Sequence, residues 1–200
     1  MRKPSLRSLV PIFLCCSIVA LLPMNLTAGP GRTPLKEVYT GTIVAIGGRA
    51  GGASTTFNLT ITDYTSDEDA LKFLGVLEEE KQDGLLRAIR KEKKGFFAIG
   101  AQTGRDINVV RVSEMDGRRK ITVVFERWMK FAELRGGYRS QDYPFGVLEL
   151  FVDQNGKGEG TYIGAAQIRM KTDKKTDKST VEIENFATYP AKLLGVRKRR

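Results

Sequence analysis

The stretch that decides the fold is "RDINVVRVSEMDGRRKITVVFERW", which runs from Arg105 to Trp128. Two runs rich in β-branched residues flank the pair Asp116-Gly117, which suits a tight turn with positive φ angles. Counting outward from this pair gives the expected partners Val112–Ile121, Val110–Val123, Val109–Val124 and Glu114–Arg119. Apolar side chains then face apolar ones and opposite charges meet, so the stretch predicts an antiparallel hairpin.

The same alternation recurs on both sides of this hairpin. Upstream, "EVYTGTIVAI" (37–46) and residues 56–62 flank the glycine-rich stretch "GGRAGGAS" and predict a second hairpin. Downstream, the segments 146–152, 161–170, 180–186 and 191–196 are further candidate strands. Eight or nine strands of this kind are typical of a sheet-dominated domain.

The stretch "DQNGKGEG" (153–160) contains oxygen-bearing residues among three glycines. As a helix-loop-helix calcium loop it fails, because Lys157 stands where the fifth position needs an oxygen ligand. We interpret it as a tight turn centred on Asn155-Gly156. Counting outward predicts the pairs Val152–Glu159, Leu150–Thr161 and Leu148–Ile163.

Residues 66 to about 92 interrupt the strand pattern with helical spacing. Ser66 is a candidate N-cap, followed by three acidic residues at the positive end of the helix dipole. The predicted buried stripe of this helix consists of Ala70, Leu71, Leu74 and Leu77. Gly84 weakens the helix, and Asp83 is a candidate cap for a second helix that carries Leu85, Leu86 and Ile89.

Together these elements predict one α+β domain over residues 37–197, mostly antiparallel β with a helical insertion. Closure as a single β-barrel and folding as a β-sandwich both remain open. A lead-in rich in Gly and Pro, residues 29–36, precedes the domain and is predicted to be flexible.

The N-terminus has the layout of a secretory signal peptide, residues 1–28. A basic start precedes an apolar run from Leu9 to Leu22, which is shorter than the roughly 20 residues of a membrane-spanning helix. We therefore expect an exported protein, periplasmic or extracellular, with no integral membrane span after cleavage. An uncleaved anchor is the alternative.

The net charge is +10, and it falls to +7 once the three basic residues of the signal peptide are removed. A positive surplus favours anionic partners. The predicted partner is an anionic or amphiphilic small molecule or the envelope surface, and no nucleic acid, because no nucleic-acid motif accompanies the charge. Much of the charge lies in "KTDKKTDKST" (171–180) and "RKRR" (197–200), which we interpret mainly as solvated.

Residue types that are missing narrow the chemistry. The chain has no histidine, and both cysteines, Cys15 and Cys16, lie inside the predicted signal peptide. Ser-His and Cys-His nucleophile pairs and the usual zinc sites are thereby excluded from the exported chain. We predict no catalytic residue, no metal site and no cofactor; whether the protein is an enzyme stays open, with a non-enzyme favoured.

The candidate binding segment is "ERWMKFAELRGGYRSQDYPF" (126–145), a connection longer than a tight turn needs. It combines aromatic and arginine side chains, which suit an anionic or sugar-like ligand. The candidate ligand-binding residues are Arg127, Trp128, Arg135, Tyr138, Arg139, Asp142 and Tyr143. The alternative is a loop that covers the open end of the sheet, with Arg139 paired locally to Asp142.

The run "RSQDYPFGVLEL…DQNGKGEGTYIGAAQI…VEIENFATYPAKLLGV" resembles a group of exported bacterial proteins of unknown function. The likeness covers much of the C-terminal half, and it implies an extracytoplasmic bacterial protein without implying an activity.

Three functions remain in competition. The leading hypothesis is an exported, non-catalytic binding or interaction domain of the cell envelope or periplasm. The second is a hydrolase that uses two converging carboxylates, acting on envelope glycans. The third is a structural partner of another envelope protein, for which an uncovered strand edge or apolar patch is the expected sign.

Overall fold

A computed structural model describes residues 36–47, 51–127, 139–173, 178–186 and 189–199, together with Met129 and Arg135. The predicted signal peptide lies outside these ranges, as does the predicted lead-in except for Lys36. The elements are β1 (Glu37–Val44), β2 (Ser54–Ile61), α1 (Asp67–Ile89), β3 (Gly95–Ile99), β4 (Arg105–Ile107), β5 (Val109–Met115), β6 (Arg118–Glu126), the 3₁₀ turn η1 (Arg139–Asp142), β7 (Phe145–Val152), β8 (Lys157–Asp173), β9 (Lys178–Asn185) and β10 (Ala191–Arg199).

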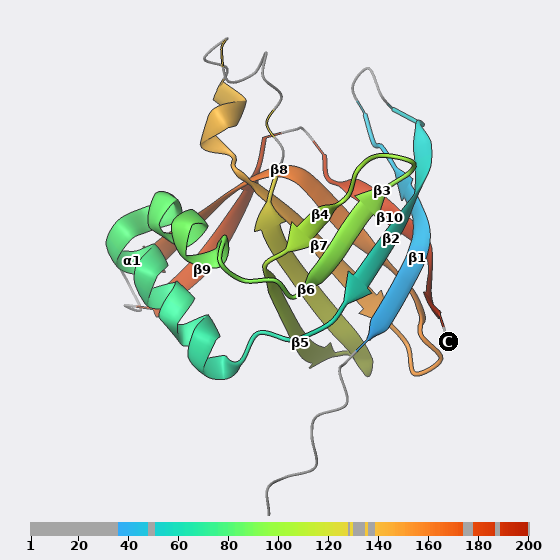
Figure 1. Ribbon diagram of the computed structural model, residues 1–200, viewed down its shortest axis with the longest axis horizontal. Coiled ribbons are helices and arrows are strands. Elements are labelled where there is room, and N and C mark those ends of the chain that lie inside the picture. The colour runs from blue at the N-terminus through green and yellow to red at the C-terminus, as the bar shows by residue number, and fades with distance from the viewer. Residues whose placement is uncertain are drawn as a thin grey trace, which may run out of the picture. The chain divides into compact units, whose positions relative to one another are not determined.

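The strands form one antiparallel sheet that nearly closes into a barrel (Figure 1). Its order is β4-β3-β2-β1-β10-β8-β7-β6-β5, and β9 pairs with the outer part of β8. The two end strands, β4 and β5, are separated in the chain by Asn108 alone. They therefore act as one interrupted strand that pairs first with β3 and then with β6. The α+β prediction is confirmed, and of its two alternatives the barrel is correct.

Asn108 bridges the interruption with its side chain. It is buried, its Nδ2 donates to the Glu92 carbonyl at 2.9 Å, and its Oδ1 accepts from the Glu126 amide at 3.1 Å. Its own amide donates to the Val124 carbonyl at 3.2 Å. Buried backbone groups need hydrogen-bond partners. The side-chain amide of Asn108 supplies them for Glu92 and Glu126, at the point where the strand pairing is interrupted.

The barrel interior is filled by large apolar side chains rather than left open. Alternation along each strand brings every second residue inward. The buried cluster comprises Tyr39, Ile43, Phe57, Leu59, Ile61, Phe97, Ile107, Val110, Ile121, Val123, Phe125, Leu148, Leu150, Val152, Leu193 and Val196. A second buried cluster lies between α1 and the outer face of the sheet, and it includes Phe73, Leu77, Phe145 and Ile168.

The predicted hairpin at Asp116-Gly117 is confirmed in its full register. Asp116 and Gly117 have φ angles of 53° and 71°, as the tight turn requires. All four predicted pairs are present between β5 and β6. The predicted hairpin of residues 37–46 with 56–62 is confirmed as well, as β1 and β2.

The predicted register of the "DQNGKGEG" hairpin is wrong by one residue. Val152 pairs with Gly158 and Leu150 with Gly160, because the turn has one residue more than a two-residue loop. The Asp153 amide donates to the Lys157 carbonyl at 2.8 Å, and Gly156 takes the positive φ of 73°. The Asp153 carboxylate holds this wider turn by accepting from the amides of Asn155 and Lys157.

The helix is confirmed in place, but its predicted buried stripe is partly wrong. Ser66 caps it, accepting from the Asp69 amide at 3.0 Å. A break lies at Lys81 (φ 61°, ψ −162°), two residues before the predicted second cap Asp83. Leu77 is buried as expected, whereas Leu71 is 69% and Leu74 38% exposed. The buried face of α1 is formed by Phe73, Leu77, Gly84, Leu85 and Ile89 instead.

Candidate functional site

A groove lies between α1 and the outer face of the sheet. Its volume is ≈ 590 Å³, within the range of small-molecule sites. The helix side is lined by Asp67, Ala70, Leu71, Phe73, Leu74, Leu77, Leu85 and Ile89, and the sheet side by Val109, Arg111, Thr122, Val124, Ile168, Val181 and Ile183. Figure 1 shows α1 beside β9, with the β8–β9 hairpin reaching past the barrel toward the helix.

The apolar rim of this groove is exposed to solvent. Leu71, Leu74, Val181 and Ile183 all keep more than a third of their surface exposed, and they come from both walls of the groove. We call the whole groove, with all the lining residues named above, the α1–β9 groove. Single exposed apolar residues are ordinary in proteins, but a concave apolar cluster is typical of a binding site.

Polar groups stand at the edge of the α1–β9 groove. The Arg111 guanidinium donates to the Asp67 carboxylate at 2.5 Å and to the Thr65 carbonyl at 2.8 Å. Arg111 and Thr122 are direct neighbours across β5 and β6, so they share a face of the sheet, and both line the groove. The groove therefore combines an apolar interior with one ion pair at its margin, a division that suits an amphiphilic molecule.

Of the seven candidate binding residues, Arg127 lines a pocket in the open end of the barrel. Its Nε donates to the Tyr143 carbonyl at 2.5 Å and its Nη2 to the Ser140 carbonyl at 2.6 Å. These bonds tie the end of β6 to the segment that leads into β7. Arg127 thus has a structural role in addition to its place in this pocket.

Tyr143 turns toward β9 instead of the pocket. Its hydroxyl donates to Glu184 at 2.8 Å, and its ring lies 5.1 Å from that of Phe186. The hydrogen bond to Glu184 and burial raise the pKa of the Tyr143 hydroxyl. Tyr143 is largely buried, so this contact anchors the β6–β7 connection onto β9.

Of the remaining five candidate residues, the structure describes three. Arg135, Arg139 and Asp142 are exposed, and the Asp142 carbonyl accepts from Gln82 of α1 at 3.0 Å. Trp128 and Tyr138 lie outside the described residues. Ligand binding by this set stays a prediction. Sequence reasoning missed the α1–β9 groove, although its signal was present in Leu71 and Leu74, two apolar residues that their spacing assigned to a core.

The other end of the barrel contains a buried ionic cluster centred on Glu37. Glu37 is 8% exposed, and its carboxylate accepts hydrogen bonds from Tyr39, Tyr64 and Lys198, each at 2.8 Å. The Arg119 guanidinium lies 3.4 Å away and donates to the Tyr64 hydroxyl at 2.9 Å. Lys198 belongs to the terminal basic run, so its interpretation as a solvated tail is wrong at this residue. The cluster joins the first strand, the last strand and β6.

The protonation states in the Glu37 cluster are those of a stabilising ionic contact rather than of a catalytic group. Burial by itself raises the pKa of Glu37, but the hydrogen bonds from Lys198, Tyr39 and Tyr64 and the charge of Arg119 outweigh it and lower the pKa to about 2. Burial and the hydrogen bond to Glu37 raise the pKa of Tyr64 to about 12, and that of Tyr39 further. Near neutral pH the carboxylate is ionised and both phenols are neutral.

Acidification should therefore weaken the fold through Glu37. Its pKa is about 2 in the folded state and 4.5 ordinarily. This shift stabilises the folded state by about 3 kcal/mol. The stabilisation is fully present above pH 4.5 and is lost as the pH falls through 2. Urea unfolding of the wild type and of Glu37→Gln between pH 2 and 6 should show a stability difference that shrinks across this window. A constant difference would contradict the assignment.

The described residues contain no group of three or more His, Cys, Asp or Glu side chains placed to hold a metal ion. No helix in the described part of the chain has both the length and the apolar composition needed to cross a membrane.

Fold and site together define a nearly closed antiparallel β-barrel with a helical insertion, in which the helix and the sheet enclose an apolar groove. Comparison with protein-family models, with curated proteins and with solved structures found no match to this chain.

Proposed function

We propose that the protein is an exported, non-catalytic binding domain of the cell envelope or periplasm, and that it binds a single-chain amphiphile in the α1–β9 groove. The observation that carries this proposal is the groove itself, which has a volume of ≈ 590 Å³ and mostly apolar walls. Export rests on the signal-peptide pattern of residues 1–28.

The shape of the groove favours an alkyl chain over a protein partner. The helix forms one wall and the outer face of β5, β6 and the β8–β9 hairpin forms the other. A trough between two walls buries a narrow ligand on several sides, whereas a protein partner needs a broader surface, typically about 800 Å² per side. An alkyl chain gains about 0.8 kcal/mol for each methylene that it buries.

The margin of the groove suits the polar head of such a ligand. Arg111 is the basic group there, and its side chain is 40% exposed. It shares the margin with Asp67, whose carboxylate is mostly solvated. The net charge of +7 on the chain without the signal peptide adds a long-range attraction for an anionic head. We infer an anionic amphiphile, such as a medium-length alkyl carboxylate.

The geometry gives no support to the hydrolase alternative. Among the described residues Glu37 is the one buried carboxylate, and Arg119 and Lys198 hold it ionised. A general acid must retain its proton near the working pH, which a carboxyl with a pKa of about 2 does not. The structural-partner alternative has one feature in its favour, since β9 pairs with β8 alone among the described strands.

The binding proposal predicts a dependence on chain length. The purified protein without residues 1–28 is titrated with n-alkyl carboxylates of about 8 to 16 carbons in competition with a fluorescent fatty-acid analogue. Affinity should rise severalfold per added methylene and then level off when the groove is full. Absence of binding at every chain length, or no dependence on length, would overturn the proposal.

A matched pair of variants places the ligand in the groove. The double change Leu71→Gln and Leu74→Gln removes two exposed apolar contacts of the rim, and it should weaken binding at least tenfold. Because both side chains are already exposed, the fold should change by less than about 1 kcal/mol. Leu194→Gln is the control, since Leu194 on β10 is 42% exposed, close to the 38% of Leu74, and does not line the groove.

A further inference from the structure

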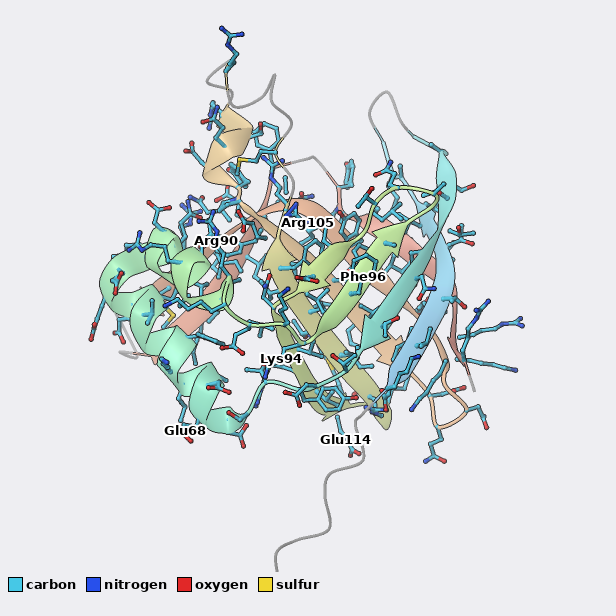
Figure 2. All side chains as sticks on the ribbon, in the orientation of Figure 1. Glu68, Arg90, Lys94, Phe96, Arg105 and Glu114 are labelled. Carbon is cyan, nitrogen blue, oxygen red and sulfur yellow. The ribbon has the colours of Figure 1, made fainter. Side chains whose placement is uncertain are left out.

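A second, smaller pocket lies in the end of the barrel opposite the Glu37 cluster. Figure 2 labels Arg105 at this end and Glu114, a neighbour of Arg119 across the β5–β6 hairpin, at the other. The pocket is ≈ 230 Å³ in volume, which is the space of about eight waters. Its described lining residues include Phe97, Thr103, Arg105, Phe125, Arg127 and Tyr162, and none of these lines the α1–β9 groove.

Three aromatic rings form the inner wall of this pocket. The ring of Phe97 lies 5.5 Å from that of Phe125 and 5.5 Å from that of Tyr162, with tilted planes. Phe97 and Phe125 belong to the barrel core and are 3% and 2% exposed, so their positions are set by packing. Tilted pairs at this spacing are favourable, and a further ring can join them at the same kind of angle.

Arg105 brings a positive charge into the pocket. It lies directly opposite Phe97 in the β3–β4 pair, and residues opposite each other in an antiparallel pair share a face of the sheet. The Arg105 side chain therefore starts from the inner face beside Phe97, and it lines both this pocket and an adjoining hollow. Burial lowers the pKa of Arg105, which shows that its charge has lost part of its hydration.

The two carboxylates that act on Arg105 line the adjoining hollow together with it, and each also contacts a second cation. The charges of Glu126 and Asp106 counter the effect of burial on the pKa of Arg105. Glu126 forms a two-point contact with Arg90, at 2.7 and 2.8 Å, and Asp106 lies 3.1 Å from Lys93. Neither carboxylate lines the pocket, whose described walls have two guanidinium groups and no acidic side chain.

Arg127 adds the second positive charge, in a fixed orientation. Its bonds to the carbonyls of Tyr143 and Ser140 hold the guanidinium at the pocket wall. Burial raises the pKa of the Tyr162 hydroxyl, and the positive charge of Arg127 partly offsets this rise. Arg127 therefore acts electrostatically on a residue of the pocket wall. The protonated hydroxyl of Tyr162 is a hydrogen-bond donor beside these two cations.

We propose that this pocket binds a small aromatic carboxylate, with its ring against Phe97 and Phe125 and its carboxylate facing Arg105 and Arg127. A guanidinium matches the planar fork of a carboxylate. The attraction between the ligand's carboxylate and the two arginines is stronger in a partly buried pocket than in water, because the effective dielectric constant is lower. The site is distinct from the α1–β9 groove, and it does not depend on the binding of an alkyl chain there.

Calorimetric titration with three probes tests the proposal. Benzoate carries ring and charge, benzyl alcohol carries the ring without the charge, and acetate carries the charge without a ring. Benzoate should bind at least tenfold more tightly than either of the others. Equal affinity for benzyl alcohol, or no binding of benzoate, would overturn the proposal.

Two variants then locate the bound benzoate. Arg105→Gln should weaken its binding at least tenfold, and the control Arg87→Gln, which removes an exposed charge on α1, should leave it unchanged. Thr103→Trp fills the entrance from an exposed position and should abolish binding without changing the charge. This variant decides the matter if Arg105→Gln does not fold. Benzoate binding that survives Thr103→Trp, or that survives Arg105→Gln in a folded protein, contradicts the assignment.

Discussion

Replacing Glu37 by Gln should lower the free energy of unfolding by about 3 to 5 kcal/mol near neutral pH. The change preserves shape but leaves Arg119 and Lys198 without the carboxylate that both contact, at 3.4 and 2.8 Å. It also removes the charged acceptor of two phenolic hydroxyls. Because the cluster joins β1, β6 and β10, its loss should loosen the barrel where the first and last strands meet. Urea unfolding at pH 7 measures this effect.

A matched control separates burial from charge. Glu80 forms an ion pair of similar length with Arg87, at 2.7 Å, but its side chain is 53% exposed. Exposed pairs contribute less than about 1 kcal/mol, so Glu80→Gln should have a small effect. If the two variants lose equal stability, the burial of the Glu37 cluster does not make it more stabilising than an exposed ion pair.

The change Gly160→Ala should destabilise the barrel by about 3 kcal/mol or more. A Cβ atom at this position would lie 2.0 Å from the Glu149 carbonyl oxygen and 3.1 Å from the Leu150 Cα. Both contacts are with backbone, so no side-chain rotation relieves them. Gly160 pairs with Leu150 on one side and Leu193 on the other, and any shift of β8 would disturb two ladders. Thermal unfolding should show a melting temperature lower by roughly 6 to 12 °C.

Gly164→Ala is the comparison in the same strand. There the nearest atom to an added Cβ is the Tyr162 hydroxyl oxygen, at the far end of a side chain and 3.3 Å away. A small displacement of that side chain relieves the contact, so we expect a loss below about 1 kcal/mol. Equal losses at the two glycines would show that the close approach of β7 and β8 at Gly160 is not the cause.

The Asn155 hairpin shows where local reasoning stops. The Asn155-Gly156 pair indicates a turn, and a turn is present. Its loop has one residue more than predicted, and the Asp153 carboxylate stabilises this longer loop by accepting from two amides. A shift of one residue moves every side chain of a strand to the other face. Gly158 and Gly160 thereby come to face Val152 and Leu150, where the backbones approach too closely for any Cβ.

The helix shows the same limit for function. Its spacing of leucines indicates an apolar face, and one exists, but the face that meets the sheet is the one bearing Phe73 and Leu77. Leu71 and Leu74 are left at the rim of the groove. The strand β3, which the sequence analysis did not identify, brings Phe97 opposite Arg105. Neither site was recognisable before the position of these elements was known.

The sequence by itself determined what depends on neighbours along the chain: most of the strands, the hairpin at Asp116-Gly117, the cap at Ser66, and the absence of histidine. Tertiary structure decided what depends on residues far apart. The ion pair of Glu37 with Lys198 spans 161 positions, and the side chain of Asn108 bonds across the interruption between β4 and β5 to Glu92 and Glu126. The reason is physical, since turns and caps follow from local hydrogen bonds, whereas burial and charge pairing depend on which strands the closed sheet brings together.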